Sequence, residues 1–510
     1  MPMEPLQSHE LLAGAVLVLV TVLLLNQLWP APRTTRPPAS PPRPRGGLPV
    51  IGNLHQLGAL PHASLAALAA EHAAPLMLLR LGSVPALVVS TAAAARAAFQ
   101  HNDRAMSGRP VQRAPARLSY GLQDITFSAP DSPLWRAARR ACLSELLGTP
   151  RVRGFRAVRE AEAAALVAAV AGAPSGTVNL SERLLSTSNR IVMRVAFGDH
   201  GEETAVLEEA QKHFGAFFVS DYVPWLGWVD ALRGLPRQLE RYYHELDAFY
   251  ERVIRDHLDK PAGSKEDNDL VDVLLRLHRD PAHRNTFGSR GAIKGILMDI
   301  FVAGTETAAA ALEWTMTELI RHPETLSKAQ REVRSIVGDR DMVLESDLSG
   351  LHYLKLVIRE SLRLHPPAPL LVPRETTEPC TVGGYEIPAR TRVIVNAKAI
   401  GTDPDAWGPD AARFVPERHD DGGGGGGVDL NDHKPWHDGF ALVPFGMGRR
   451  SCPGVHFATA VVELLLANLL FCFEWRAPLG GGAVDVEEKP GLVVSRKNPL
   501  VLVAERRGVK

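Results

Sequence analysis

The chain has 510 residues, 45% hydrophobic and 22% charged, which is the composition of a globular protein large enough for an extensive core. Its 57 basic and 57 acidic residues cancel, so net charge gives no reason to expect a nucleic-acid partner. The four cysteines, Cys142, Cys380, Cys452 and Cys472, show no CxxC spacing. This argues against a zinc knuckle or a disulfide scaffold and favours reduced thiols.

The N-terminus carries a long apolar segment. Residues 11–29, LLAGAVLVLVTVLLLNQLW, come close to the roughly 20 residues that a membrane-spanning helix requires. A cleaved signal peptide is the alternative, but it would need a basic start, whereas MPMEPLQSHE has two Glu and no Lys or Arg. Positive charge instead follows the segment, at Arg33, Arg36, Arg43 and Arg45. Residues 1–29 are therefore predicted to be a single-pass anchor that leaves the rest of the chain in the cytosol.

A proline-rich connector and one large body follow the anchor. Residues 30–47 contain seven prolines, which exclude a helix and predict a stiff, extended hinge. The body, residues 48–510, shows mostly helical patterns, for example at 64–74, 157–173 and 291–320. Strand patterns are fewer and occur at 76–82, at 86–91 and, as a hairpin around Gly-Gly, at 380–400. We expect a mainly α protein with a minor β portion, and assign no function to the six glycines at 422–427.

One short helical stretch combines an indole with several guanidinium groups. In PLWRAARRACL, Trp135 and Arg139 lie one helical turn apart, so both can donate hydrogen bonds to one anionic group. An ordinary amphipathic surface helix would show the same pattern. Arg136 and Arg140 add positive charge, for which a solvated face is the simplest explanation.

A long apolar helix contains a polar interruption. GILMDIFVAGTETAAAALEWTM, residues 295–316, places a glycine, two hydroxyls and an acid at Gly304, Thr305, Glu306 and Thr307. A polar stripe facing solvent is one explanation. Nearly every side of this helix is apolar, however, which predicts burial and requires a role for its polar groups. A glycine beside a threonine can open a gap in the helical hydrogen-bond ladder, with room for dioxygen and water.

A further helical segment, YLKLVIRESLRLHPP, carries Glu360 and Arg363 three residues apart. Most such pairs are surface ion pairs that contribute a few tenths of a kcal/mol, so the spacing alone does not indicate a special role.

The segment FGMGRRSCPG encloses Cys452 between arginines, glycines and a Pro-Gly turn. A buried structural thiol is the simplest explanation, because free cysteine is among the most buried residue types, but it leaves these neighbours unexplained. Gly446, Gly448 and Gly454 permit a backbone that approaches a flat cofactor closely and points amides at the sulfur. Arg450 is placed to meet an anionic group. The next residues, HFATAVVELLLANLLF, predict a helix whose N-terminus favours a thiolate.

These segments together carry a family resemblance. Phe445-x-x-Gly448-x-Arg450-x-Cys452-x-Gly454 resembles the haem-binding signature of the cytochrome P450 family. The resemblance extends from LPVIGNL at 48–54 to GLVVSRKNPLVL at 491–502, and PPRPRGGLPVIGNLH is similar to the proline hinge of the plant microsomal A-type branch, with Arg43 where glycine is usual. It implies the cytochrome P450 fold, mainly α with minor β.

The resemblance also implies a role for each marked residue. Cys452 would be the axial ligand of haem b, and Thr307, Glu306 and Gly304 would belong to the oxygen-activation motif, in which Glu306 and Thr307 relay protons. Haem contacts are implied for Trp135, Arg139, Arg374, Phe445, Gly448, Arg450 and Gly454. A structural triad that holds the ligand loop in register is implied for Glu360, Arg363 and Arg418. An acidic flavoprotein reductase would dock on Arg136, Arg140 and Arg449.

Three positions depart from the family pattern. Ala308 stands where a second serine or threonine is common, Lys398 where tryptophan is common, and His419 where the phenylalanine of PERF is usual. We expect the first to remove a side hydrogen bond and the second to alter packing beside the haem. We expect the third to weaken only the apolar packing after Arg418.

The implied activity is that of an O2-dependent monooxygenase in the endoplasmic reticulum membrane, supplied with electrons from NADPH by NADPH-cytochrome P450 reductase. Mostly apolar pocket candidates predict a small hydrophobic or aromatic substrate; they are residues 110–127, Phe217, Phe218, the helix before Gly304, Leu370–Val372 and Leu492–Val493. YYHELDAFYERVIRDHLD and DLVDVLL are similar to the plant aldoxime-metabolising subfamily. Two alternatives stay open: a haem-thiolate dehydratase or isomerase without a reductase, and a non-catalytic membrane-tethered protein.

Overall fold

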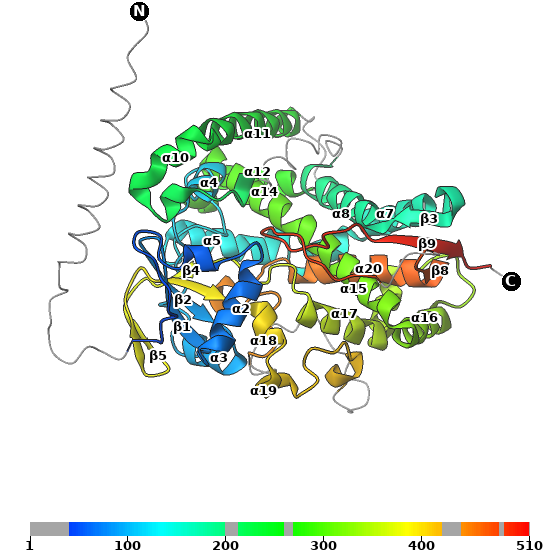
Figure 1. Ribbon diagram of the computed structural model, residues 1–510. Coiled ribbons are helices and arrows are strands. Elements are labelled where there is room, and N and C mark those ends of the chain that lie inside the picture. The colour runs from blue at the N-terminus through cyan, green and yellow to red at the C-terminus, as the bar shows by residue number, and fades with distance from the viewer. Residues whose placement is uncertain (1–39, 199–212, 260–268, 421–439, 479–483, 509–510) are drawn as a thin grey trace, which may run out of the picture.

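The computed structural model describes residues 40–198, 213–259, 269–420, 440–478 and 484–508, and this part of the chain is mainly helical, as the sequence predicts (Figure 1). The predicted anchor, most of the predicted hinge and the six glycines lie outside the described residues. The longer helices are α2 (Pro61–Glu71), α3 (Ala92–Phe99), α5 (Pro133–Ala141), α7 (Arg156–Ala171), α8 (Leu180–Phe197), α11 (Leu235–Leu258), α12 (Leu270–Arg279), α14 (Arg290–Gly304), α15 (Glu306–Arg321), α16 (Pro323–Val337), α17 (His352–Leu364) and α20 (Val455–Cys472). Shorter helices are α4 (Arg113–Leu118), α6 (Thr149–Gly154), α10 (Gly227–Leu232), α13 (Arg284–Phe287), α18 (Ala397–Gly401) and α19 (Pro404–Trp407).

The strands form small sheets at two sides of the molecule. Their bounds are β1 (Leu76–Leu81), β2 (Val84–Val89), β3 (Thr177–Asn179), β4 (Arg374–Glu375), β5 (Cys380–Val382), β6 (Tyr385–Ile387), β7 (Arg392–Val395), β8 (Phe473–Arg476) and β9 (Val501–Arg506). One sheet has the order β1-β2-β7-β4, a second the order β3-β9-β8, and β5 pairs with β6. Figure 1 shows the first sheet with α2 and α3 on one side of the molecule and β8 and β9 on the other.

The four-stranded sheet is covered on both faces. Successive side chains of a strand point to opposite faces. Accordingly, Leu87 and Val89 of β2 pack in a core with α3, whereas Ala86 and Val88 pack in another core with α2. The predicted strand at 76–82 is confirmed by β1. The one predicted at 86–91 is confirmed by β2, which begins and ends two residues earlier.

The strand pattern at 380–400 divides into three pieces. The predicted hairpin is confirmed, since β5 and β6 are joined by Gly383 and Gly384, whose φ angles are 56° and 84°. β7 then leaves the hairpin and pairs with β2 in parallel. The prediction is wrong for the last residues, which form α18, because the Asn396 side chain accepts a hydrogen bond from Ala399 N at 3.1 Å and caps that helix.

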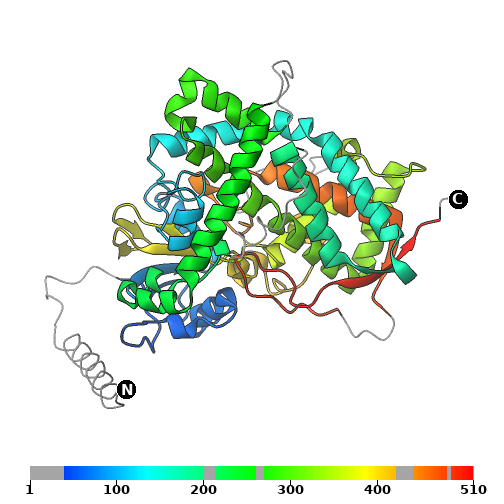
Figure 2. The ribbon, with the colours of Figure 1, turned by 90° about the horizontal axis from the view of Figure 1, so that it is seen from above.

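The largest core lies among the helices. Buried residues of α7, α8, α14, α15, α17 and α20 form one continuous cluster, and Figure 2 shows these helices side by side, away from the N-terminal sheet. The stretches Arg290–Arg321 and Val455–Cys472 are long and apolar enough to span a membrane, but 61% and 83% of their apolar windows are buried inside the protein. Within the described part of the chain, both are therefore core helices rather than membrane spans.

An ionic cluster ties the C-terminal segment to α2 and α18. Glu488 accepts a hydrogen bond from His62 at 2.7 Å and forms an ion pair with Lys398. Lys398 does not line the cavity described below, so the expected change in packing beside a haem is replaced by this ion pair. Burial by itself would raise the pKa of Glu488, but the His62 hydrogen bond and the Lys398 charge outweigh it and lower the pKa to about 2.

This lowered pKa predicts a loss of stability in acid. Because the pKa of Glu488 is lower in the folded than in the unfolded state, its contribution is complete above pH ~4.5 and is lost as the pH falls toward 2. A shift of this size corresponds to about 3 kcal/mol at neutral pH. We expect Glu488→Gln to lower the free energy of unfolding at pH 7, and the difference from wild type to shrink by about half or more at pH 3, as measured by urea unfolding. An equal difference at both pH values would contradict this.

Candidate functional site

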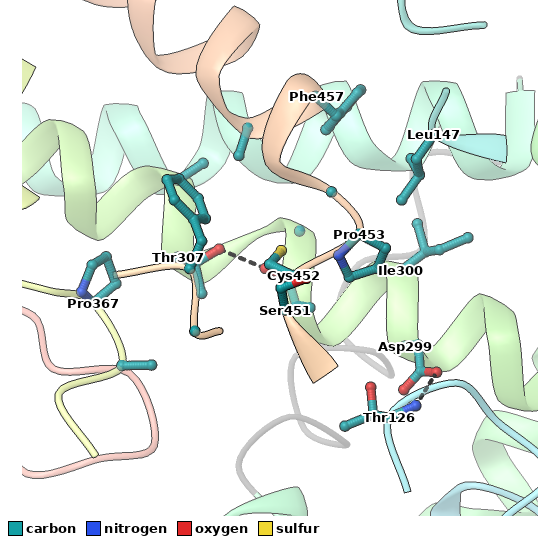
Figure 3. Close-up of a pocket in the computed structure, with 18 of the residues that line it drawn as sticks. Thr126, Leu147, Asp299, Ile300, Thr307, Pro367, Ser451, Cys452, Pro453 and Phe457 are labelled. Carbon is teal, nitrogen blue, oxygen red and sulfur yellow. Dashed lines mark hydrogen bonds between the residues drawn. The ribbon is translucent and has the colours of Figure 1, made fainter. Parts of the chain in front are cut away.

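A cavity of about 280 Å³ lies between the α14–α15 pair and the loop that precedes α20 (Figure 3). Apolar side chains form most of its wall, among them Ile300, Ala303, Leu371, Val372 and Phe457. The residues predicted for the site that do line it are Arg139, Gly304, Thr307, Arg374, Phe445, Arg450, Cys452 and Gly454. Those that do not are Trp135, Glu306, Glu360, Arg363, Arg418 and Gly448. Segments far apart in sequence therefore supply one apolar cavity with a thiol, a hydroxyl and several cations.

Glycines set the backbone path of the loop before Cys452. Gly446 and Gly448 have φ angles of 72° and 62°, which L side chains rarely adopt. At Gly448 a Cβ would also lie 2.1 Å from Asp103 Oδ1, so no larger residue fits there. The Cys452 N–H donates to the Phe445 carbonyl at 2.8 Å and closes the loop.

The surroundings of the Cys452 sulfur act on its pKa in two directions. Burial raises the pKa of the thiol, whereas the Gly454 N–H and the Arg139 charge lower it. Helix α20 begins at Val455, so its positive N-terminal end lies beside the sulfur. A Cβ on Gly454 would lie 3.9 Å from the sulfur, which is an ordinary van der Waals distance. Cys452 lines the cavity, and its surroundings supply the sulfur with groups that favour a thiolate.

Two predicted cofactor arginines contact the same loop. Arg139 of α5 donates from Nη2 to the Ser451 carbonyl at 2.8 Å. Arg374 of β4 is 4% exposed, pairs with Asp103 at 3.2 Å and donates to the Met447 carbonyl. Both guanidinium groups therefore hold the loop and line the cavity beside it.

Two other predicted cofactor residues donate to the segment between α4 and α5. Trp135 Nε1 and Arg450 Nη1 each lie 3.0 Å from the Ile125 carbonyl oxygen. Arg450 also donates to the carbonyls of Ser107, at 2.9 Å, and Ser128. Burial, followed by the Arg374 charge, lowers the pKa of Arg450 to about 10, so it remains a cation at neutral pH.

The long apolar helix is interrupted where the sequence places its polar residues. α14 ends at Gly304 and α15 begins at Glu306, with Thr305 between them outside either helix. Thr307 Oγ1 lines the cavity and donates to the Ala303 carbonyl at 2.5 Å, as the dashed line in Figure 3 marks. Glu306 is half-buried in the first turn of α15, where a negative charge is favoured by the helix dipole.

Glu360 of α17 is the centre of a buried ionic network. It is fully buried and accepts from Arg363 Nε at 2.7 Å and Arg418 Nε at 2.9 Å. His419 donates to the same carboxylate at 2.8 Å and lies edge-on to Trp407. The expectation that His419 only weakens apolar packing is therefore wrong, because its imidazole adds a hydrogen bond. Burial alone would raise the pKa of Glu360, but the Arg363 and His419 bonds outweigh it, and the pKa is about 2.

Two charged residues of the cavity were not predicted. Arg109 is half-buried and donates to the carbonyls of Thr126 at 2.9 Å and Pro373 at 2.8 Å, and desolvation is the main cause that lowers its pKa. Asp299 of α14 accepts from the Ile125 and Thr126 N–H groups at 2.7 and 3.1 Å. Burial raises the pKa of Asp299 to about 6 against these hydrogen bonds. Asp299 could have been found, because it is the one acid in the apolar stretch 295–303.

Some predicted pocket residues lie elsewhere. Phe217, Phe218, Leu492 and Val493 do not line the cavity. Phe218 is 2% exposed and belongs to the helical core, whereas Phe217 stacks on Tyr222 at the surface with ring centroids 5.1 Å apart. On the Cys452 side, Arg136, Arg140 and Arg449 are exposed, and Arg449 N donates to Asp103 at 3.0 Å.

Comparison with known proteins shows which family the chain belongs to. Residues 41–503 match the sequence model of the family described as Cytochrome P450. The chain belongs to the cytochrome P450 family. Cytochrome P450 71A9 of Glycine max is 47% identical, with 96% of this chain and 97% of the relative covered. Strychnine-11-hydroxylase of Strychnos nux-vomica is 46% identical over 91% of each chain. Tryptamine 5-hydroxylase of Oryza sativa subsp. japonica is 44% identical, covering 97% of this chain and 95% of the relative.

Family membership confirms the resemblance and the enzyme class. The protein is a cytochrome P450 monooxygenase, with a haem cofactor, O2 and a small-molecule substrate, and a redox partner reductase is typical of the family. The residues present fit a haem. A thiol that lines the cavity suits an iron, the apolar walls suit a flat ring, and the guanidinium groups of Arg139, Arg374 and Arg450 suit carboxylates.

Proposed function

We propose that this P450 is a monooxygenase in which the Cys452 thiolate would hold haem b, and that it inserts one oxygen atom from O2 into a small hydrophobic or aromatic metabolite. One observation carries the proposal: the Cys452 thiol and the Thr307 hydroxyl enter the same cavity, one from the loop before α20 and the other from α15 (Figure 3). When bound, the haem supplies the iron at which O2 is reduced, and thiolate ligation favours cleavage of the O–O bond.

The cations around the cavity hold the propionate groups of the cofactor in this proposal. Arg139 and Arg374 donate to the cysteine loop, Arg450 belongs to that loop, and the Trp135 ring lies 4.6 Å from the Arg450 guanidinium. Each offers N–H donors, and a guanidinium can pair with a carboxylate through two of them. Phe445, Gly448 and Gly454 shape the loop, and the Glu360–Arg363–Arg418 network holds it in register.

Thr307 holds the proton that the reaction needs. Its Oγ1 lines the cavity and is already a donor, to the Ala303 carbonyl. The helix interruption at Thr305 and the small Gly304 leave room on this wall for dioxygen. Glu306, one residue before Thr307, replaces the proton from the other side of the wall.

Electrons come from NADPH through NADPH-cytochrome P450 reductase, which docks on Arg136, Arg140 and Arg449. Residues 1–29 anchor the protein in the endoplasmic reticulum membrane, residues 30–47 are the hinge, and residues 48–510 form the cytosolic catalytic domain.

Two relatives are named as hydroxylases, of strychnine and of tryptamine, which supports hydroxylation of a specialised metabolite. The aldoxime substrate stays a prediction. NADPH-dependent product formation separates this proposal from a reductase-independent dehydratase or isomerase.

Thr307→Ala is expected to separate O2 consumption from product formation. The variant should bind haem and substrate like the wild type, but the fraction of NADPH electrons that reaches product should fall about tenfold or more, because a positioned proton donor is lost. The missing electrons should appear as hydrogen peroxide. The measurement is the ratio of product to NADPH oxidised in the reconstituted system.

Thr315→Ala is the matched control. Thr315 makes the same kind of hydrogen bond, to the Ala311 carbonyl at 2.6 Å on α15, but does not line the cavity. It should leave the ratio of product to NADPH unchanged. If the ratio of product to NADPH oxidised were the same in Thr307→Ala and wild type, Thr307 would not be the proton donor.

A further inference from the structure

The segment between α4 and α5 forms part of the cavity wall although it has no regular secondary structure. Residues 124–128, here called the wall loop, run as a series of bends, and Ile125 and Thr126 line the cavity. A loop without helix or strand partners must have its buried backbone polar groups satisfied in some other way. The backbone N–H and carbonyl groups of the wall loop must therefore find hydrogen-bond partners outside regular secondary structure.

Side chains from distant elements satisfy that backbone. The Ile125 carbonyl accepts from Trp135 and Arg450, each at 3.0 Å, and the Thr126 carbonyl accepts from Arg109 at 2.9 Å. The two N–H groups have a different partner: both donate to Asp299 Oδ2, at 2.7 and 3.1 Å. The Ile125 and Thr126 carbonyls are thus held by three donors, whereas their N–H groups depend on the Asp299 carboxylate. The next two N–H groups of the wall loop, those of Phe127 and Ser128, donate to Asp124 Oδ1 at 2.9 Å.

Asp299 reaches the wall loop from α14, which ends at Gly304 and is followed, after the break at Thr305, by α15 with Glu306 and Thr307. Asp299, Ala303 and Thr307 are spaced by four residues and all line the cavity. Figure 3 shows the Asp299 carboxylate facing Thr126. Among the described residues that line the cavity, Asp299 is the only acid. The positive charge of Arg109 lies close enough to lower the pKa of this carboxyl, although burial, the larger effect, raises it. α14 therefore supplies the support of the wall loop, and α15, which follows after the break at Thr305, supplies the proton donor.

We infer that Asp299 is a positioning residue that fixes Ile125 and Thr126 against α14 and thereby determines how tightly the cavity holds a bound molecule. This inference rests on the proposed function, in which the cavity holds haem and substrate. Asp299 acts as a hydrogen-bond acceptor rather than as a counter-charge for a cationic substrate, because Oδ2 already accepts two N–H groups and Arg109 lies nearby. Precise placement of a binding wall depends on such supporting hydrogen bonds.

Two substitutions distinguish the role of Asp299 as a hydrogen-bond acceptor from the role of its negative charge. Asp299→Asn keeps a carbonyl oxygen of the same reach and removes the charge, whereas Asp299→Ala leaves both N–H groups without their acceptor. The Ile125 and Thr126 carbonyls remain held by Arg109, Trp135 and Arg450 in both variants. Should Asp299→Ala fold poorly, Asp299→Ser, whose hydroxyl is too short to reach both N–H groups, takes its place.

The probes are imidazole and 1-phenylimidazole, titrated spectroscopically into the haem-loaded protein. Imidazole binds the iron without contacting the wall loop, whereas the phenyl group of the larger probe must pack against the wall loop. For Asp299→Ala we expect the Kd of 1-phenylimidazole to rise about tenfold and that of imidazole to change less than about twofold, since two hydrogen bonds of the wall are lost. Asp299→Asn should bind both probes like the wild type.

Two results would overturn the inference. If Asp299→Asn weakened 1-phenylimidazole binding as much as Asp299→Ala, the charge and not the acceptor would matter. If Asp299→Ala left both Kd values unchanged, the wall would not depend on Asp299. Failure of the proposed function is distinguishable, because then the wild type itself would lack the thiolate band in the carbon monoxide difference spectrum.

Discussion

Replacement of Cys452 by serine is expected to abolish thiolate ligation. The carbon monoxide difference spectrum of the dithionite-reduced protein should lose its red-shifted Soret band, because a serine hydroxyl does not supply a thiolate sulfur. Monooxygenase activity should fall by about 1,000-fold or more, which corresponds to about 4 kcal/mol of lost transition-state stabilisation. The measurements are the spectrum and NADPH-dependent product formation.

Cys142 offers a matched control for this experiment. It is a second buried thiol that lines the same cavity, and burial raises its pKa to about 12. Cys142→Ser should keep the thiolate band. The assignment would be refuted by the opposite pattern, in which the band survives in Cys452→Ser and disappears in Cys142→Ser.

Replacement of Glu360 by alanine is expected to cost about 3–5 kcal/mol of the free energy of unfolding, as for other broken buried ion pairs. The buried guanidinium of Arg363 would lose both of its carboxylate bonds, at 2.7 and 2.8 Å, and Arg418 and His419 would lose theirs. Since small domains are stable by only about 5–15 kcal/mol, a large fraction of the protein should be unfolded or without haem. Urea unfolding and the yield of haem-loaded protein measure this.

An exposed ion pair provides the comparison. Arg476 and Glu505 approach to 2.6 Å, but their side chains are 48% and 60% exposed. Glu505→Ala should cost no more than about 1 kcal/mol. If both substitutions had the same small effect, the burial of Glu360 would not be the source of its contribution.

The local pattern of apolar and polar residues predicted the fold class and most of the helices and strands that carry the site residues. Periodicity identified the long apolar helix, both strands of the first hairpin and the hairpin at Gly383–Gly384. It did not identify α18, because the cap at Asn396 changes the structure within one residue. It also did not separate α14 from α15, although the glycine and threonine at the break were recognised as able to open the helix.

The candidate site could be predicted where a motif is continuous in sequence. Cys452 and its loop were recognised because glycines, arginines and the following helix lie within a few residues of each other. His419 was misjudged, since its bond to Glu360 spans 59 residues and has no local signal. Phe217 and Phe218 were assigned to the cavity from the layout that the family resemblance implies, which does not show whether a given side chain lies in the core, at the surface or in the pocket wall.

The amino-acid sequence by itself determined the family, the fold class and the identity of the residues expected to carry the chemistry, because these depend on short-range spacing and on residue type. Only the tertiary structure decided that Asp299 holds Ile125, 174 positions away, and that Arg450 holds the same residue from 325 positions away. Such contacts follow from the packing of the whole body around the cavity, in which each buried backbone group must find a partner. The spacing of residues along the chain therefore does not predict these long-range contacts.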